Sequence, residues 1–238
     1  MVGFTAIKKY DEFTLIEEVT TGQTIFKIDN SFYKVSEEEK EKYTRNKIVK
    51  DEYIIKDNFL FSIIPTILIL ATVVLYFYNV DYKIVDKGIW LATIFLIINI
   101  PIHELGHIVM AKLLCKEANI RAGMTIAFIN PAFYVDTSCS YVCPKHRRIS
   151  IYLAGNMFNA LFVIMVMVGA KQYLKYCYLI ILNIIVNFLP IVRSDGYNIY
   201  LALFNKYRLA KNKRDLFMED FLRGICMTGL LFAVSCYL

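Results

Sequence analysis

The sequence predicts a mainly α-helical membrane protein that crosses the bilayer several times, and three observations favour this class. Once Gly is counted in place of Tyr, about 54% of the 238 residues are apolar, above the roughly 45–50% of an ordinary soluble domain. Long stretches carry no charged side chain, and most of the 27 Lys and Arg residues lie between those stretches. This composition excludes a disordered chain and a disulfide-rich scaffold.

Residues 1–57 form the first predicted segment, which is polar and mixed in charge. Stretches 12–19, 23–28 and 31–35 are typical of short strands joined by turns, and Ser36 with Glu39 forms a capping-box pattern that favours a helix start. We therefore expect a small cytoplasmic α+β segment before a transmembrane domain of residues 58–238. The segment weakly resembles the small peptide-binding domains of peptide-maturation systems, and a structural appendage is the alternative.

Five apolar stretches predict about five transmembrane helices. Residues 59–80 contain no charged side chain, and at 1.5 Å per residue they span about 33 Å, close to a hydrocarbon core about 30 Å thick. The remaining spans are predicted over residues 88–114, 151–169, 173–192 and 222–238.

Lys and Arg residues predict which way these spans face, because cytoplasmic loops carry the positive surplus. With five spans, the two loops on the side of the N-terminal segment carry 12 of these residues, and the opposite side carries 4. Residues 1–15 lack the basic start and apolar stretch of a signal peptide. We therefore expect a multi-pass protein of the cell membrane with a retained, cytoplasmic N-terminus. The net charge of +6 then reflects topology, and no nucleic-acid partner is needed to explain it.

An H-E-x-x-H motif, formed by His103, Glu104 and His107, lies inside the second predicted span. Its two imidazoles share one helical face, and a carboxylate follows the first. Ionisable groups at this depth are costly and generally face a cavity or a partner. Zn²⁺ would be such a partner, since imidazole is one of its preferred ligands and a nearby carboxylate can activate a water molecule. A polar helix face satisfied by neighbouring helices is the alternative.

A third ligand is expected, because a catalytic zinc usually has three protein ligands and one open position. His146 lies in a basic stretch with Lys145 and Arg147, which favours a residue that faces solvent or lipid headgroups. A carboxylate is the better candidate. Asp195 follows the fourth span at its cytoplasmic end, at a depth compatible with both histidines. From spacing alone, a cap or turn role before Gly196 is an equal alternative for Asp195.

Residues 123–137 predict a re-entrant β-hairpin that enters the membrane from the cytoplasmic side. The stretch is apolar, rich in β-formers, broken by Asn130 and Pro131, and too short for two helical crossings. A strand edge there could pair with an extended peptide by β-addition. A re-entrant plug without peptide contact is the alternative.

These motifs together resemble the site-2 protease family of intramembrane zinc metalloproteases. The family signature combines H-E-x-x-H, a G-x-x-x-N motif in a central helix and a later Asp-Gly pair, which here fall at residues 103–107, 155–159 and 195–196. Three longer stretches resemble the bacterial branch of peptide zinc metalloproteases: PAFYVDTS (131–138), HRRISIYLAGN (146–156) and NFLPIVRSDGY (187–197). Two departures, Asn156 where many members have Pro and Ser194 where they have an apolar residue, remove neither a ligand nor the base.

The resemblance implies a zinc endopeptidase with His103, His107 and Asp195 as ligands and Glu104 as the catalytic base. It also implies substrate-binding roles for Gly155 and Asn159, with helix packing as the alternative. The expected substrate is a membrane-embedded or ribosomally made precursor peptide in a bacterial membrane. A non-catalytic peptide-binding, transport or immunity protein of the same fold is the other function class, and the intact Glu104 favours the enzyme. The sequence predicts no oligomeric state.

Overall fold

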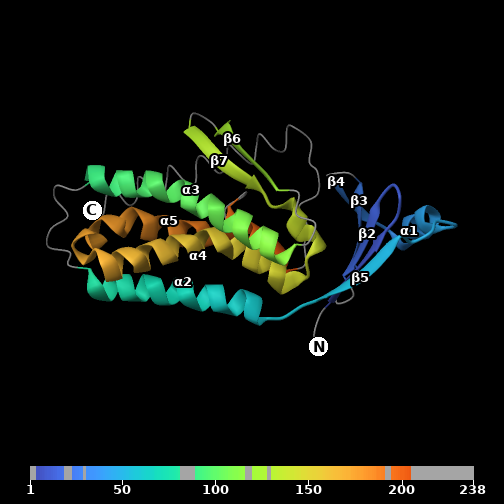
Figure 1. Cartoon of the computed structure of the whole chain (residues 1–238), viewed down its shortest axis with the longest axis horizontal. Coiled ribbons are helices and arrows are strands. Elements are labelled where there is room, and N and C mark those ends of the chain that lie inside the picture. The colour runs from blue at the N-terminus through green and yellow to red at the C-terminus, as the bar shows by residue number, and fades with distance from the viewer. Residues whose placement is uncertain are drawn as a thin grey trace.

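The computed structural model describes residues 4–18, 23–28, 31–80, 89–115, 120–127, 130–190 and 194–204. Along these residues a small sheet with one helix is followed by a helical part that carries a β-hairpin (Figure 1). The fifth predicted span, residues 222–238, lies outside the described residues.

The N-terminal part is a five-stranded antiparallel sheet in the order β4-β3-β2-β1-β5. Its strands are β1 (Phe4–Lys9), β2 (Thr14–Glu18), β3 (Gln23–Ile28), β4 (Ser31–Val35) and β5 (Asp51–Lys56). The strands predicted over residues 12–19, 23–28 and 31–35 are confirmed as β2, β3 and β4. The edge strand β5 pairs with β1, with Tyr53 opposite Ile7, so two segments far apart in the sequence lie side by side in the sheet.

Helix α1 (Glu37–Thr44) covers one face of this sheet, and its predicted capping box is confirmed. The Ser36 hydroxyl accepts from the Glu39 N–H at 3.2 Å, and the Glu39 carboxylate accepts from the Ser36 N–H at 3.0 Å. Lys40 then reaches the Glu17 carboxylate of β2 at 2.7 Å. The helix is therefore fixed both at its start and against the sheet.

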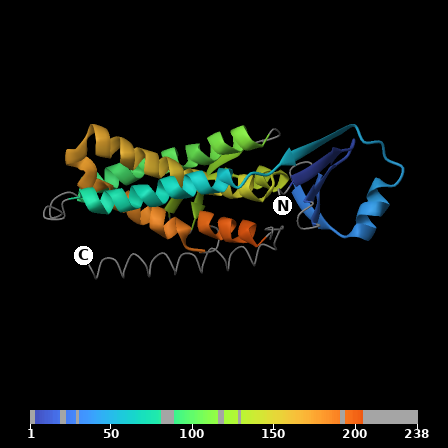
Figure 2. The same cartoon turned by 90° about the horizontal axis from the view of Figure 1, so that it is seen from below.

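The opposite face of the sheet packs against the helical part. The contact is made by the short 3₁₀ helix η2 (Ser138–Val142), whose Val142 joins the apolar cluster of Ile7, Ile16, Ile25 and Ile55. The rings of Phe32 and Tyr141 meet edge to face, with centroids 5.3 Å apart. Both views accordingly place the sheet at one end of the helical part (Figures 1 and 2).

Three of the described helices are long and apolar enough to cross a membrane: α2 (Leu60–Asn79), α3 (Ile89–Leu114) and α4 (Lys145–Gly169). They correspond to the first three predicted spans. Large apolar side chains such as Ile64, Ile67 and Leu70 on α2 and Ile97 on α3 are exposed, as expected for helices that face lipid.

The fourth predicted span is not a single long α-helix. Residues 171–188 form a 3₁₀ helix, η3 (Lys171–Cys177), followed by the 11-residue α5 (Tyr178–Phe188). At 1.5 Å per residue α5 alone extends about 17 Å, and η3 at 2.0 Å per residue adds about 14 Å, so a crossing by this stretch stays a prediction. It ends as the chain becomes extended at Leu189, because the residue before a proline avoids the α conformation. The described residues therefore contain three candidate spanning helices where the sequence predicted about five in the whole chain.

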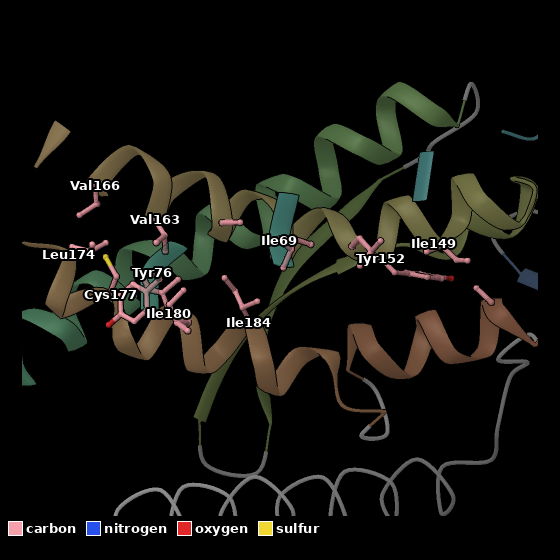
Figure 3. Packing of buried hydrophobic residues seen from close by; sticks show 14 residues of the cluster. Ile69, Tyr76, Ile149, Tyr152, Val163, Val166, Leu174, Cys177, Ile180 and Ile184 are labelled. Atoms are coloured by element: carbon pink, nitrogen blue, oxygen red, sulfur yellow. The ribbon is translucent and has the colours of Figure 1, made fainter. Parts of the chain in front are cut away.

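Helix α4 is the centre of the helical part, and its buried side chains meet those of α2, η3 and α5 (Figure 3). The cluster includes Ile69 and Tyr76 of α2, Val163 and Val166 of α4, Leu174 and Cys177 of η3, and Ile180 and Ile184 of α5. Helix α3 and the short α6 (Asp195–Leu203) also contact α4. Because both elements contact α4, residues of α3 and α6 can lie close to one another beside this helix.

The start of α4 is capped by a residue from another part of the chain. Pro144 precedes the helix and offers no side-chain cap. Asp57, in the linker between β5 and α2, accepts a hydrogen bond from the His146 N–H at 3.2 Å, and the Ser62 hydroxyl lies 2.8 Å from His146 Nδ1. The linker from the sheet to the first long helix is thereby tied to the end of α4.

The predicted hairpin is present as β6 (Arg121–Ala127) and β7 (Asn130–Asp136), paired antiparallel with Arg121 opposite Asp136. At its base, Cys115 and Cys139 approach from the two flanking segments, and the Cys115 thiol lies 3.5 Å from the Cys139 carbonyl oxygen. Cys143 packs in the same buried cluster. All three cysteines are free thiols. The depth of the hairpin in a bilayer stays a prediction.

Candidate metal centre

Three potential ligand atoms converge between α3 and the start of α6. Nε2 of His103 lies 3.0 Å from Oδ2 of Asp195, Nε2 of His107 lies 3.3 Å from the same oxygen, and the two nitrogens are 3.3 Å apart. These atoms form a group that could hold a metal ion, with both imidazoles buried and the carboxylate partly buried. The structure thus brings together residues separated by 92 positions in the sequence.

The other ring nitrogens are held by α4. Nδ1 of His107 lies 2.8 Å from the carbonyl oxygen of Ile151, which can only accept, so this nitrogen carries the proton. With a cation bound, Nε2 of His107 would present its lone pair beside Asp195. Nδ1 of His103 lies 3.0 Å from the side-chain amide of Asn159. Such outer partners orient histidine ligands in metal sites.

Gly155 gives the imidazoles the space they occupy. A Cβ atom built at this position would lie 2.4 Å from Nε2 of His103 and 2.6 Å from Nε2 of His107, so the imidazoles would have to move to admit it. Gly106 plays the matching part on α3, because a Cβ atom there would lie 2.5 Å from the carbonyl oxygen of Ala154. The two glycines therefore let α3 and α4 approach closely where the ligands meet.

Asp195 is the first residue of α6, and its neighbour performs the capping. The Ser194 hydroxyl accepts from the Tyr197 N–H at 3.1 Å, so the Asp195 carboxylate is free to face the histidines. Burial by itself raises the pKa of this carboxyl, but the imidazoles of His107 and His103 outweigh that effect and hold the pKa below its ordinary range. An anionic carboxylate at this position suits a divalent cation.

Glu104 stands beside the three ligand residues. Its carboxylate lies near the backbone of Val135 in β7, since α3 packs against this strand, and near His103, His107 and Asp195. Strand β7 of the hairpin therefore lies beside the H-E-x-x-H motif of α3, a contact that the sequence did not predict. No local pattern could have indicated it, because it joins a strand and a helix that pack only in the tertiary fold.

The donor set fits zinc. Two imidazole nitrogens and one carboxylate oxygen are ligands that Zn²⁺ accepts in catalytic sites, which keep a further position open. The glycine at residue 155 leaves room beside these atoms that a side chain would fill. The arrangement can also provide a carboxylate for proton transfer, because Glu104 adjoins the cluster without being one of the three converging groups.

Among curated proteins, the chain is similar to the "Putative peptide zinc metalloprotease protein YydH" of Bacillus subtilis (strain 168). The two are 31% identical over 119 residues, which is 47% of this chain and 47% of that protein. The chain thus matches about half the length of this relative. No family model matches the chain, and no solved structure matches it. The similarity supports a metalloprotease-like protein in broad terms.

Proposed function

We propose that the chain is a zinc-dependent endopeptidase that cleaves a peptide at or within the membrane. The observation that carries this proposal is the convergence of His103, His107 and Asp195, with Glu104 beside them, inside a helical part that contains three candidate spanning helices. The name of the B. subtilis relative supports the same reaction class. The site-2 protease-like subtype and the cytoplasmic N-terminus are part of the proposal.

In this proposal His103, His107 and Asp195 hold the ion through Nε2, Nε2 and Oδ2. When bound, zinc would supply Lewis-acid chemistry, polarising a carbonyl and lowering the pKa of a water molecule. Glu104 would take the proton of the attacking water on its carboxylate and pass it to the leaving amine, so that the peptide bond is hydrolysed. The nearby Val135 backbone would keep the hairpin close to the Glu104 carboxylate.

The hairpin offers a way to present the substrate. A helical substrate must be unwound before its carbonyl groups are accessible, and an extended peptide can pair with a free strand edge. β6 occupies one edge of β7, and Val135 of β7 lies near Glu104. We place the substrate strand along the other edge of β7, where its backbone would pass the catalytic carboxylate. The proposed substrate is a membrane-embedded or ribosomally made precursor peptide.

The proposal is tested with the purified full-length chain in detergent or lipid nanodiscs. Bound zinc is measured by elemental analysis, and cleavage is followed by mass spectrometry on membrane-inserted candidate peptides, including any small precursor encoded beside the gene. Glu104→Gln should keep zinc and lower the cleavage rate by about 10²–10⁴-fold. His103→Ala should lose both, whereas the matched variant His146→Ala, which changes a histidine outside the cluster, should lose neither.

Two results would contradict the proposal in different ways. A wild-type chain without zinc would remove the metal site itself. Zinc bound with no Glu104-dependent cleavage of any peptide would favour a non-catalytic peptide-binding, transport or immunity protein. Chelation followed by zinc addition separates these results from simple inactivation, because an active chain should lose cleavage with the chelator and regain it with the ion.

A further inference from the structure

The contact between Asn159 and His103 carries more information than packing alone. Asn159 is fully buried in α4, and its side-chain amide lies 3.0 Å from Nδ1 of His103. The atom facing Nδ1 is assigned as the amide nitrogen, while the amide oxygen is buried without a hydrogen-bond partner among the described residues. A buried acceptor left in this state is costly.

The metal-facing side of His103 fixes which atom Asn159 must present. Nε2 points at Asp195 and His107, so it has to keep its lone pair free if the cluster is to hold a cation. The single ring proton then lies on Nδ1, which becomes a donor. The Asn159 atom that lies 3.0 Å from this N–H group must therefore be an acceptor, and an amide nitrogen cannot accept. The amide oxygen and nitrogen have nearly the same shape and are exchanged by rotating the amide group.

We propose that Asn159 is a positioning residue whose Oδ1 accepts the Nδ1–H hydrogen bond of His103, and so fixes the ring and the tautomer that leaves Nε2 free for zinc. This inference rests on the proposed function and replaces the substrate-binding role expected for Asn159 from the sequence. The Ile151 carbonyl oxygen accepts the Nδ1–H hydrogen bond of His107 in the same way. Both histidines of the motif are thereby oriented by α4, one by its backbone and one by a side chain.

The test measures zinc affinity, by competition with a chromophoric chelator, for the full-length chain and three variants. Asn159→Leu removes the acceptor and should weaken zinc binding about 10–100-fold. Asn159→Asp keeps an acceptor of the same shape and should stay within about tenfold of wild type. Asn156→Leu is the matched control, because Asn156 is equally buried on the same helix and has no hydrogen-bond partner among the described residues. Its zinc affinity should equal that of wild type.

Each pattern of results decides between roles. Equal weakening by Leu and Asp at residue 159 would overturn the acceptor role, since it would mean that Asn159 acts as a donor. Unchanged affinity in both variants with cleavage lost would overturn it in favour of direct substrate contact. The affinities are measured without substrate, so a wild-type chain that binds zinc but cleaves nothing would count against the proposed function and leave the positioning role standing. A wild-type chain that binds no zinc would overturn both.

Discussion

A Cβ atom on Gly155 would lie 2.4 Å from Nε2 of His103. This distance relates a backbone position on α4 to a ligand atom on α3, and it explains why a residue without a side chain occupies the middle of the central helix. Among the described residues, the space beside Gly155 holds both Nε2 atoms of the H-E-x-x-H motif. The glycine therefore serves the geometry of the ligand residues, and the substrate-binding role expected for Gly155 from the sequence stays a prediction.

Gly155→Ala should weaken zinc binding, because the new methyl group would displace the two imidazole nitrogens. We expect a loss of at least about tenfold in zinc affinity, with cleavage reduced in parallel. Gly169→Ala is the matched control on the same helix, since a Cβ atom there meets nothing within 4 Å. Zinc titration of both variants checks the prediction. Normal zinc binding by Gly155→Ala would show that α3 and α4 do not approach this closely.

Asp57→Ala should loosen the start of α4. The substitution removes the acceptor for the His146 N–H, and the loss of a helix cap typically costs about 0.5–2 kcal/mol. Hydrogen exchange of the first-turn amides of α4, together with the unfolding midpoint, would report the change. Asp51→Ala is the control, because its exposed ion pair with Lys9 contributes no more than about 1 kcal/mol. Equal effects of the two substitutions would contradict the capping role.

Phe32→Ala should weaken the attachment of the N-terminal sheet to η2. The edge-to-face contact with Tyr141 is worth about 0.5–1.5 kcal/mol beyond its buried area, and the ring also packs on the cluster of Val142. We expect faster tryptic cleavage between β1–β4 and α2, around Lys47 and Lys50. Tyr33→Ala, on the same strand but with an exposed ring, should leave the cleavage rate unchanged. Identical digestion patterns for both variants would argue against the sheet contact.

The thiols at the base of the hairpin should react slowly with alkylating reagents in the folded chain. The contact with the Cys115 thiol and burial raise the pKa of the Cys139 thiol above its ordinary range, which keeps it protonated at neutral pH. Labelling at pH 7 followed by mass spectrometry should show Cys139 modified at least about tenfold more slowly than in the denatured chain. Rapid modification in the folded state would mean that the hairpin base is open.

Features set by neighbouring residues could be predicted from the sequence. The capping box at Ser36 depends on residues three positions apart, and the strands β2 to β4 are joined by short turns. The H-E-x-x-H motif is local in the same way, since one helical face aligns His103 and His107. The first three apolar stretches likewise indicate helices, because they are long and carry few charged residues.

Features that depend on distant partners could not be predicted in this way. β5 pairs with β1 across more than 40 positions, and its sequence is too charged to be recognised as a strand. The hydrogen bond between Asp57 and His146 and the approach of Val135 to Glu104 each join separate elements. Composition also could not distinguish one long helix from η3 followed by α5, because apolar content does not fix the helix type.

In the proposed endopeptidase, the long separation between the ligand residues would affect when activity can begin. Asp195 follows His103 by 92 positions, and the intervening chain includes the hairpin, the whole of α4 and α5. A nascent chain that has inserted α3 alone offers two imidazoles but no carboxylate, and it lacks the α4 groups that orient both rings. The complete ligand set arises only when α6 has been synthesised and has packed against α4. In the proposed endopeptidase, biosynthesis itself would therefore delay proteolysis until the ligand set is assembled.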